Sequence, residues 1–236
     1  MNKKPLTILL IIFFLITASI SFLFSPFFKV REFSIHSRQE IDKKALQRAL
    51  LELYDYNILL LDKDIIKSKL ERFSFISSIE IKKTLPSKVH IIIDERTPIA
   101  WIDNKKSRII FSADGIILNE VTDDRIIDLP ELAGVAYKFD NNKLKFPDYT
   151  DVLFSALLKI DQNLLHKINK ILYTDDGIYK LYLDTNTGVN LGTKENIEKK
   201  FNILASILQK IESENKKADY IDLKVVKHPV IKLKSE

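Results

Sequence analysis

The sequence has no cysteine among its 236 residues. This absence excludes disulfides, thiolate metal ligands, cysteine nucleophiles and the acylated cysteine of a lipoprotein. Glycine is scarce as well, because the five glycines all fall at Gly115 or later. Such a change in composition along the chain indicates two modules, and we place the start of the second at Pro98.

Familiar catalytic and nucleotide-binding motifs are also missing. There is no G-x-G-x-x-G, P-loop, G-x-S-x-G or H-E-x-x-H pattern, and the four histidines lie on unrelated segments. Asp175 and Asp176 precede Gly177, and Asp184 opens the stretch DTNTG, so both places are typical of turns rather than of a carboxylate pair or a calcium loop. The net charge of +5 forms no dense basic stripe, which disfavours nucleic acid as a partner. We expect no catalytic residues, no metal site and no cofactor.

One long apolar run is present, near the amino terminus. Residues 6–24 carry no charge and reach about 28 Å as a helix, close to the ~30 Å hydrocarbon core of a bilayer. Lys3 and Lys4 precede the run and predict a cytoplasmic amino terminus with an exported remainder. No second run of this length follows, so we expect a single crossing.

A cleaved signal peptide is the alternative reading of this run, since Thr17, Ala18 and Ser19 offer small residues to a peptidase. The apolar character continues beyond them to Phe28. We therefore favour an uncleaved transmembrane anchor over 6–28, after a short cytoplasmic tail at 1–5.

The next segment has the periodicity of a small α+β domain. Val89, Ile91 and Ile93 alternate with polar or outward residues, as in a half-buried strand, and Asp62 is a suitable N-cap for a helix. We expect the charged Asp94-Glu95-Arg96 to end the last strand in solvent. The expected order is strand, helix, helix, strand, strand, over 29–36, 41–53, 62–73, 77–85 and 89–95.

The second module is expected to be β-rich, with a mixed or antiparallel sheet and flanking helices. Asp114-Gly115 suits a hairpin turn, and the stretch LPELAG reads as a loop. Ile221 and Leu223 alternate with Asp222 and Lys224, which predicts a terminal strand continuing to Val226. The other expected elements are strands at 100–102, 170–174, 178–184 and 188–192, and helices at 149–167 and after Thr193.

Several stretches together carry a resemblance to a known family. No single one is decisive, but they occur in the right order along nearly the whole chain. The chain resembles the FtsQ/DivIB cell-division proteins, and its first module is similar to their POTRA domain. The matching stretches are NILLLD (57–62), FSFISSIEIKKTLPSKVHIIIDERTPIAW (73–101), SADGIIL (112–118), LPELAG (129–134), VNLGTKENIEKKFNIL (189–204) and YIDLK (220–224).

The resemblance implies a non-catalytic divisome scaffold in the cell inner membrane at the division septum. Its bulk would be periplasmic, with a POTRA domain at 29–97 and a β domain at 98–236. It would bind FtsB- and FtsL-like proteins by strand addition at its last strand, and other membrane divisome proteins through the POTRA domain. The implied partner-binding residues are Tyr220, Ile221, Asp222, Leu223, Lys224, Val225, Val226 and Lys227, with Lys200 and Thr193 on the preceding helix segment.

Other interpretations stay open at this point. The last strand can be an ordinary closing strand without a partner. The chain can also be a membrane-anchored periplasmic hydrolase whose carboxylates, such as Asp175 and Asp184, converge in space. A third possibility is a POTRA-containing protein of outer-membrane assembly or secretion, although the chain lacks room for a long β-barrel.

Overall fold

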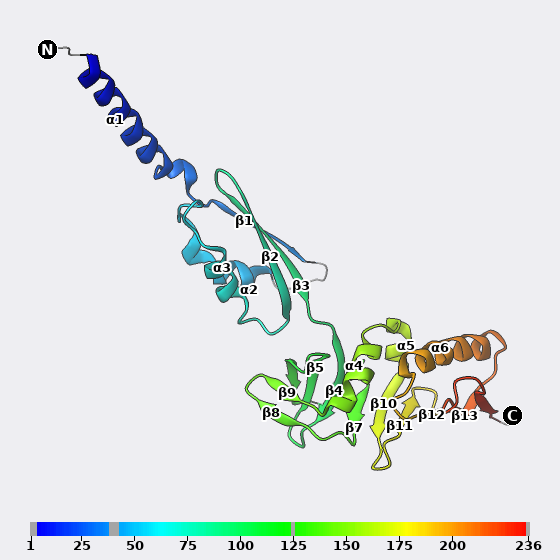
Figure 1. The fold of residues 1–236 in the computed structure, drawn as a ribbon. Helices are drawn as coiled ribbons and strands as arrows, with labels where there is room; N and C mark the ends of the chain where they lie inside the picture. Colours follow the sequence, from blue (N-terminus) through cyan, green and yellow to red (C-terminus); the bar gives the residue numbers. More distant parts are fainter. Residues whose placement is uncertain (1–3, 38–42, 124–125, 235–236) are drawn as a thin grey trace. The chain divides into compact units, whose positions relative to one another are not determined.

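The computed structural model describes residues 4–37, 43–123 and 126–234. The chain divides into two compact units, Met1–Arg96 and Thr97–Glu236. Each unit has its own cluster of buried apolar side chains, so each can be considered by itself. The observed α+β composition, with an apolar first helix, agrees with the expected fold class (Figure 1).

The chain begins with the apolar helix α1, Lys4–Leu23, followed by the 3-10 turn η1, Pro26–Phe28. Its apolar side chains are exposed, and the stretch Leu6–Phe28 is long and apolar enough to cross a membrane. The helix therefore starts at Lys4, inside the segment 1–5 expected to be a cytoplasmic tail. Residues 1–3 lie outside the described part of the chain.

The rest of the first unit is a three-stranded sheet with two helices, in the expected order. β1 pairs parallel with β3, and β2 pairs antiparallel with β3, so β3 is central. Val89, Ile91 and Ile93 of β3 are fully buried, as their alternation predicts. The helix expected over 41–53 is shorter, and residues 38–42 lie outside the described part. The elements are β1 Glu32–Ser37, α2 Lys43–Ala49, η2 Leu51–Leu53, α3 Lys63–Leu70, β2 Ile76–Thr84 and β3 Lys88–Glu95.

The charged triplet Asp94-Glu95-Arg96 at the end of β3 is not simply solvated, which corrects the expectation that it ends the strand in water. Asp94 accepts a hydrogen bond from Ser78 Oγ at 2.8 Å, and Glu95 accepts one from Ser37 Oγ. Arg96 Nη1 donates to the carbonyl of Ser74 at 2.8 Å and to that of Ile76. The reason is the central position of β3, because strands on both sides supply partners to its charged end.

The second unit is built on a nine-stranded sheet with the order β14-β13-β12-β11-β10-β7-β4-β5-β6. A small two-stranded sheet, β8 and β9, lies outside it. The strands are β4 Pro98–Asp103, β5 Arg108–Ser112, β6 Ile117–Val121, β7 Glu131–Ala133, β8 Lys138–Asp140, β9 Lys143–Lys145, β10 Ile168–Tyr173, β11 Tyr179–Leu183, β12 Gly188–Gly192, β13 Ala218–Asp222 and β14 Val230–Leu233.

The helices of this unit pack their apolar faces into its core, and Figure 1 shows α5 and α6 along one side of β10 to β13. The single helix expected over 149–167 is divided into three pieces. The break has a local cause, since the side chain of Asp161 accepts a hydrogen bond from Asn163 N at 2.8 Å and starts a new helix. The pieces are η3 Asp148–Thr150, α4 Asp151–Leu157 and α5 Gln162–His166, and the long helix α6 is Ile197–Ser213.

The stretch LPELAG is not only a loop, because it contains β7. This strand pairs parallel with β4 on one side and with β10 on the other, and so joins the two halves of the sheet. Trp101 on β4 is bound to the same stretch, with its Nε1 donating to the Leu129 carbonyl at 3.0 Å. A Cβ at Gly134 would lie 2.0 Å from the Tyr173 carbonyl oxygen, so only glycine permits this close approach.

We predict that Arg96→Met lowers the free energy of unfolding of the first unit by about 1–3 kcal/mol, because hydrogen bonds from a charged donor to two backbone carbonyls are lost. Chemical denaturation followed by circular dichroism measures the change. Arg48→Met, at an exposed position on α2, is the matched control and should change stability by less than about 0.5 kcal/mol. Equal effects of both substitutions would contradict the role of Arg96.

Candidate partner-binding edge

The segment expected to be an open terminal strand is an interior strand followed by a loop. β13 pairs parallel with β12 and antiparallel with β14, so Ile221 faces Val189 on one side and Ile231 on the other. The expectation of a free backbone is therefore wrong for Ile221 and Asp222, and the residues after Asp222 do not continue the strand as expected. The physical reason is a second short apolar strand beyond Pro229, which folds back onto β13.

The residues after β13 form a loop that is held to the sheet. Leu223 is fully buried, and its N–H donates to the Asn190 carbonyl at 2.8 Å. Lys224 Nζ lies 3.3 Å from an Asp222 carboxylate oxygen. Gly192 has a φ of +72°, and a Cβ there would approach Lys224 Cγ to 3.1 Å. The loop thus packs closely against the end of β12, while Val225, Val226 and Lys227 lie outside any strand.

The edge of the sheet at this end is β14. Val230 is 61% exposed, and Ile231 and Leu233 are each 41% exposed. Ile231 lies opposite the fully buried Ile221, and Leu233 lies opposite the buried Ala218. Because paired residues project from the same face, these two side chains continue the apolar core layer to a place where it is no longer covered. Together with the outward N–H and C=O groups of the strand, they form what we call the β14 edge.

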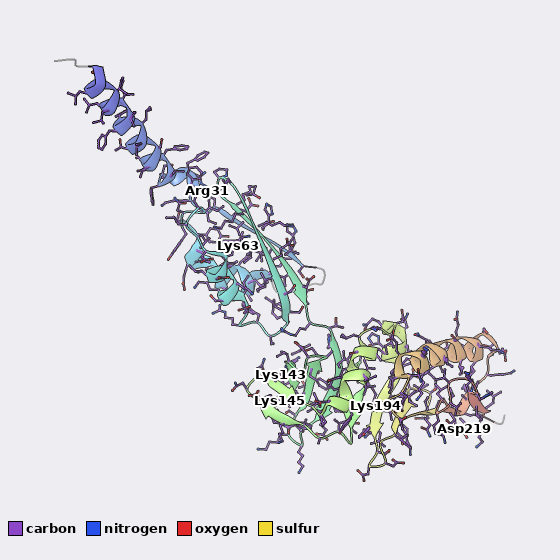
Figure 2. All side chains as sticks on the ribbon, viewed as in Figure 1. Arg31, Lys63, Lys143, Lys145, Lys194 and Asp219 are labelled. Carbon is purple, nitrogen blue, oxygen red and sulfur yellow. The ribbon has the colours of Figure 1, made fainter. Side chains whose placement is uncertain are left out.

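One charged pair fastens β14 to β13. Lys232 Nζ lies 2.8 Å from Asp219 Oδ2. Asp219 is labelled in Figure 2. The hydrogen bond from Lys232 and its positive charge lower the pKa of Asp219, and the same carboxylate raises the pKa of Lys232. The pair is exposed to solvent, so it orients the hairpin more than it stabilises the domain.

The opposite edge of the sheet, β6, is less available. The N–H of Ile117 donates to the Asn142 carbonyl at 3.0 Å, and Asn142 Nδ2 donates to the Ile117 carbonyl at 3.3 Å. The start of β6 is thus already bonded, and Glu120 places a charge further along the strand. Natural sheets protect an edge by such means. β14 also carries one charged residue, Lys232, but among the described residues no other segment pairs with its outer edge.

Lys200 and Thr193, the two candidate residues ahead of the last strand, bind each other. Lys200 is only 2% exposed, and its Nζ donates to the Thr193 carbonyl at 3.2 Å. Burial lowers the pKa of Lys200, an effect that the nearby Glu195 carboxylate partly offsets. Lys200 is therefore occupied within its own unit, and its expected part in partner binding stays a prediction. Its amine fixes the segment before α6, while Thr193 stays exposed and its role remains a prediction.

The carboxylates considered for a hydrolase do not converge. Asp175 lies in the turn before β11 and Asp184 in the turn after it, and both are exposed. The length of β11 separates them by roughly 16 Å or more. Within residues 4–37, 43–123 and 126–234, no group of three or more metal-ligating side chains comes together.

The buried amine of Lys200 has a measurable consequence for stability. Because burial places its folded pKa below the ordinary value of 10.5, the folded state binds fewer protons than the unfolded state between the two values. The free energy of unfolding should therefore rise with pH across that window. We predict this rise for the natural protein, relative to Lys200→Met, in urea titrations as the pH approaches 10.5 from below. Lys199→Met, which alters an exposed neighbour, should follow the natural protein. Parallel profiles for all three proteins would contradict the burial of the amine.

Comparison with known proteins gives two family models that match in chain order. One is described as POTRA domain, FtsQ-type, over residues 28–96, and the other as Cell division protein FtsQ/DivIB, C-terminal, over residues 100–224. The second match includes β13 and ends before β14. Both descriptions name FtsQ, and neither describes a protein of outer-membrane assembly.

Individual cell division proteins are similar to the chain over most of its length. DivIB of Clostridium tetani is 26% identical over 218 residues, which cover 89% of this chain and 81% of that protein. FtsQ of Syntrophotalea carbinolica is 23% identical over 223 residues, covering 89% and 75%. The solved extracytoplasmic domain of DivIB from Geobacillus stearothermophilus aligns with 51% of this chain and 95% of its own, at 15% identity and a TM-score of 0.36. With both units matched, this chain belongs to the FtsQ/DivIB family of cell division proteins.

Proposed function

We propose that this protein is a single-pass scaffold of the divisome that recruits FtsB- and FtsL-like proteins through the β14 edge. The observation that carries the proposal is the exposure of Ile231 and Leu233 beside the fully buried Ile221, on a strand with one unpaired edge. Membership in a family of cell division proteins supports the role in division. The proposal moves strand addition from residues 221–226 to residues 230–233.

Strand addition suits this edge physically. An extended partner segment would complete the backbone hydrogen bonds of β14, which gives affinity with little dependence on sequence. Selectivity would come from apolar side chains of the partner that cover Ile231 and Leu233. Asp219 pairs with the charge of Lys232, while Lys234 adds a positive charge directly after the strand, so the complementary segment would carry an acidic residue near this end.

Membrane insertion of α1 is the second part of the proposal. The apolar span Leu6–Phe28 and the positive charges of Lys3 and Lys4 support an inner-membrane protein with its amino terminus in the cytoplasm and its two units in the periplasm. Anchoring would keep the β14 edge in the periplasm, close to the membrane. The periplasmic parts of membrane-bound partners would be found in the same place. The POTRA unit would contact other membrane divisome proteins.

We predict that Ile231→Asp and Leu233→Asp each weaken binding of the periplasmic part of an FtsB-like partner at least about tenfold, because a carboxylate would lose water in the docked complex. Binding is measured by titration calorimetry with the fragment 29–236. The matched control is Val225→Asp, since Val225 is 57% exposed in the loop before β14 and belongs to no strand. Affinity unchanged by the two β14 substitutions, or lost equally in the control, would contradict docking at this edge.

A truncated chain distinguishes a partner that pairs with β14 from a partner that replaces β14 beside β13. A chain ending at His228 lacks β14 and leaves β13 exposed on the side that β14 covers. The proposal predicts that this chain loses the partner, while its circular dichroism and unfolding midpoint show that the second unit is still folded. Retained or tighter binding would mean that the partner pairs with β13 in place of β14, and would overturn the proposal.

A further inference from the structure

Within the first unit, the segment that follows α1 holds one loop of the sheet-and-helix part at the end of this helix. Asn57 Nδ2 donates a hydrogen bond to the carbonyl of Leu23, the last residue of α1, at 2.7 Å. The N–H of Ile58 donates to the Phe28 carbonyl at 2.8 Å, and Val30 N–H donates to the Tyr56 carbonyl at 2.9 Å. The loop 55–61 is therefore fixed next to the point where the apolar span ends.

The side chains of this loop divide into two groups. Ile58 and Leu61 are buried in the core of the unit, with 0% and 1% exposure. Tyr56, Leu59 and Leu60 point outward and are 52%, 40% and 66% exposed. Two successive exposed leucines beside an exposed tyrosine are unfavourable in water and have no role in packing the unit. The two leucines lie within the stretch NILLLD, in which Ile58 and Leu61 are buried in the core and Asp62 caps α3.

A second loop reaches the same end of the unit. The Ser87 carbonyl, in the turn between β2 and β3, accepts a hydrogen bond from Arg31 N–H at 2.9 Å. Arg31 follows η1 by three residues, so the turn lies close to the end of the span. Leu85 in this turn is 57% exposed. In Figure 2 Arg31 is labelled at the end of the unit that joins α1.

The residues around these leucines are those of a membrane interface. Phe24 and Phe27, which follow α1, are 63% and 51% exposed, and aromatic rings concentrate at the level of lipid headgroups. Arg31 comes next in the chain, together with Lys29, whose Nζ lies 3.8 Å from an Asp55 carboxylate oxygen. Long cationic side chains can lie along the apolar boundary while their charges meet anionic headgroups.

We propose that Tyr56, Leu59, Leu60 and Leu85 form a membrane-contacting face, which inserts at headgroup depth into the leaflet where α1 ends. The occupant of this face is phospholipid. The inference rests on the membrane insertion of α1 proposed above. It adds a second contact, which limits the freedom of the first unit to swing about the end of its anchor. The hydrogen bond from Asn57 also satisfies a helix-terminal carbonyl at the edge of the bilayer, where an unpaired one is costly.

The absence of cysteine makes a direct test possible. Leu60→Cys and Leu85→Cys are introduced singly into the full chain, labelled with the environment-sensitive fluorophore NBD, and reconstituted in vesicles of phosphatidylethanolamine and phosphatidylglycerol. Ser77→Cys is the control, because Ser77 is exposed on β2 about 25 Å along the strand from Leu85. We expect labels at 60 and 85 to emit at shorter wavelength than the label at 77. They should be at least threefold less quenched by aqueous iodide, and quenched by a nitroxide near the lipid headgroup.

Three results would overturn the inference. Equal iodide quenching at 60, 85 and 77 would show that the face is in water. Protection that disappears when the protein-to-lipid ratio is lowered tenfold would assign the face to a second copy of the chain rather than to lipid. Failure of the protein to float with the vesicles would remove the anchor itself, and with it the membrane part of the proposed function. Flotation with unprotected labels would reject the membrane-contacting face alone.

Discussion

A β-strand has hydrogen-bonding groups along two edges, and in the second unit both edges of β13 are paired. This constraint decides where another chain can join the sheet. The free edge lies one strand further on, at β14, where the core layer ends with Ile231 and Leu233 only partly covered. At the other end of the sheet, hydrogen bonds between Ile117 and Asn142 occupy the start of β6. The sheet is therefore asymmetric in its availability, and the proposed docking of a partner depends on this asymmetry.

The first unit shows a comparable division between residues that build the fold and residues that face outward. In the loop 55–61, Ile58 and Leu61 enter the core while Leu59 and Leu60 do not. The charged end of β3 is held by partners on both neighbouring strands, with Arg96 bound to the carbonyls of Ser74 and Ile76. Hydrogen bonds to Leu23 and from Arg96 fix the backbone at the end of α1 and at the end of the unit.

Much of the fold could be predicted because periodicity and capping act locally. The alternation of Val89, Ile91 and Ile93, and the cap at Asp62, gave the correct elements of the first unit. Failures arose where tertiary pairing decides the outcome. The three residues of β7 carry no periodic signal, and β13 stops at Asp222 because Leu223 turns into the core and Lys224 packs on Gly192. The burial of Lys200 was equally invisible, since its partner is a backbone carbonyl. The position of β14 as the edge strand could be recognised only from the strand pairing in the structure.

Amide hydrogen exchange of the fragment 29–236, with and without the periplasmic part of an FtsB-like partner, tests the central claim most directly. The account predicts that amides of 230–233 gain protection on binding, while those of 218–222 keep the protection they already have between β12 and β14. Loss of protection at 230–233 on binding, with new protection confined to 218–222, would show that β14 is displaced and would contradict the account.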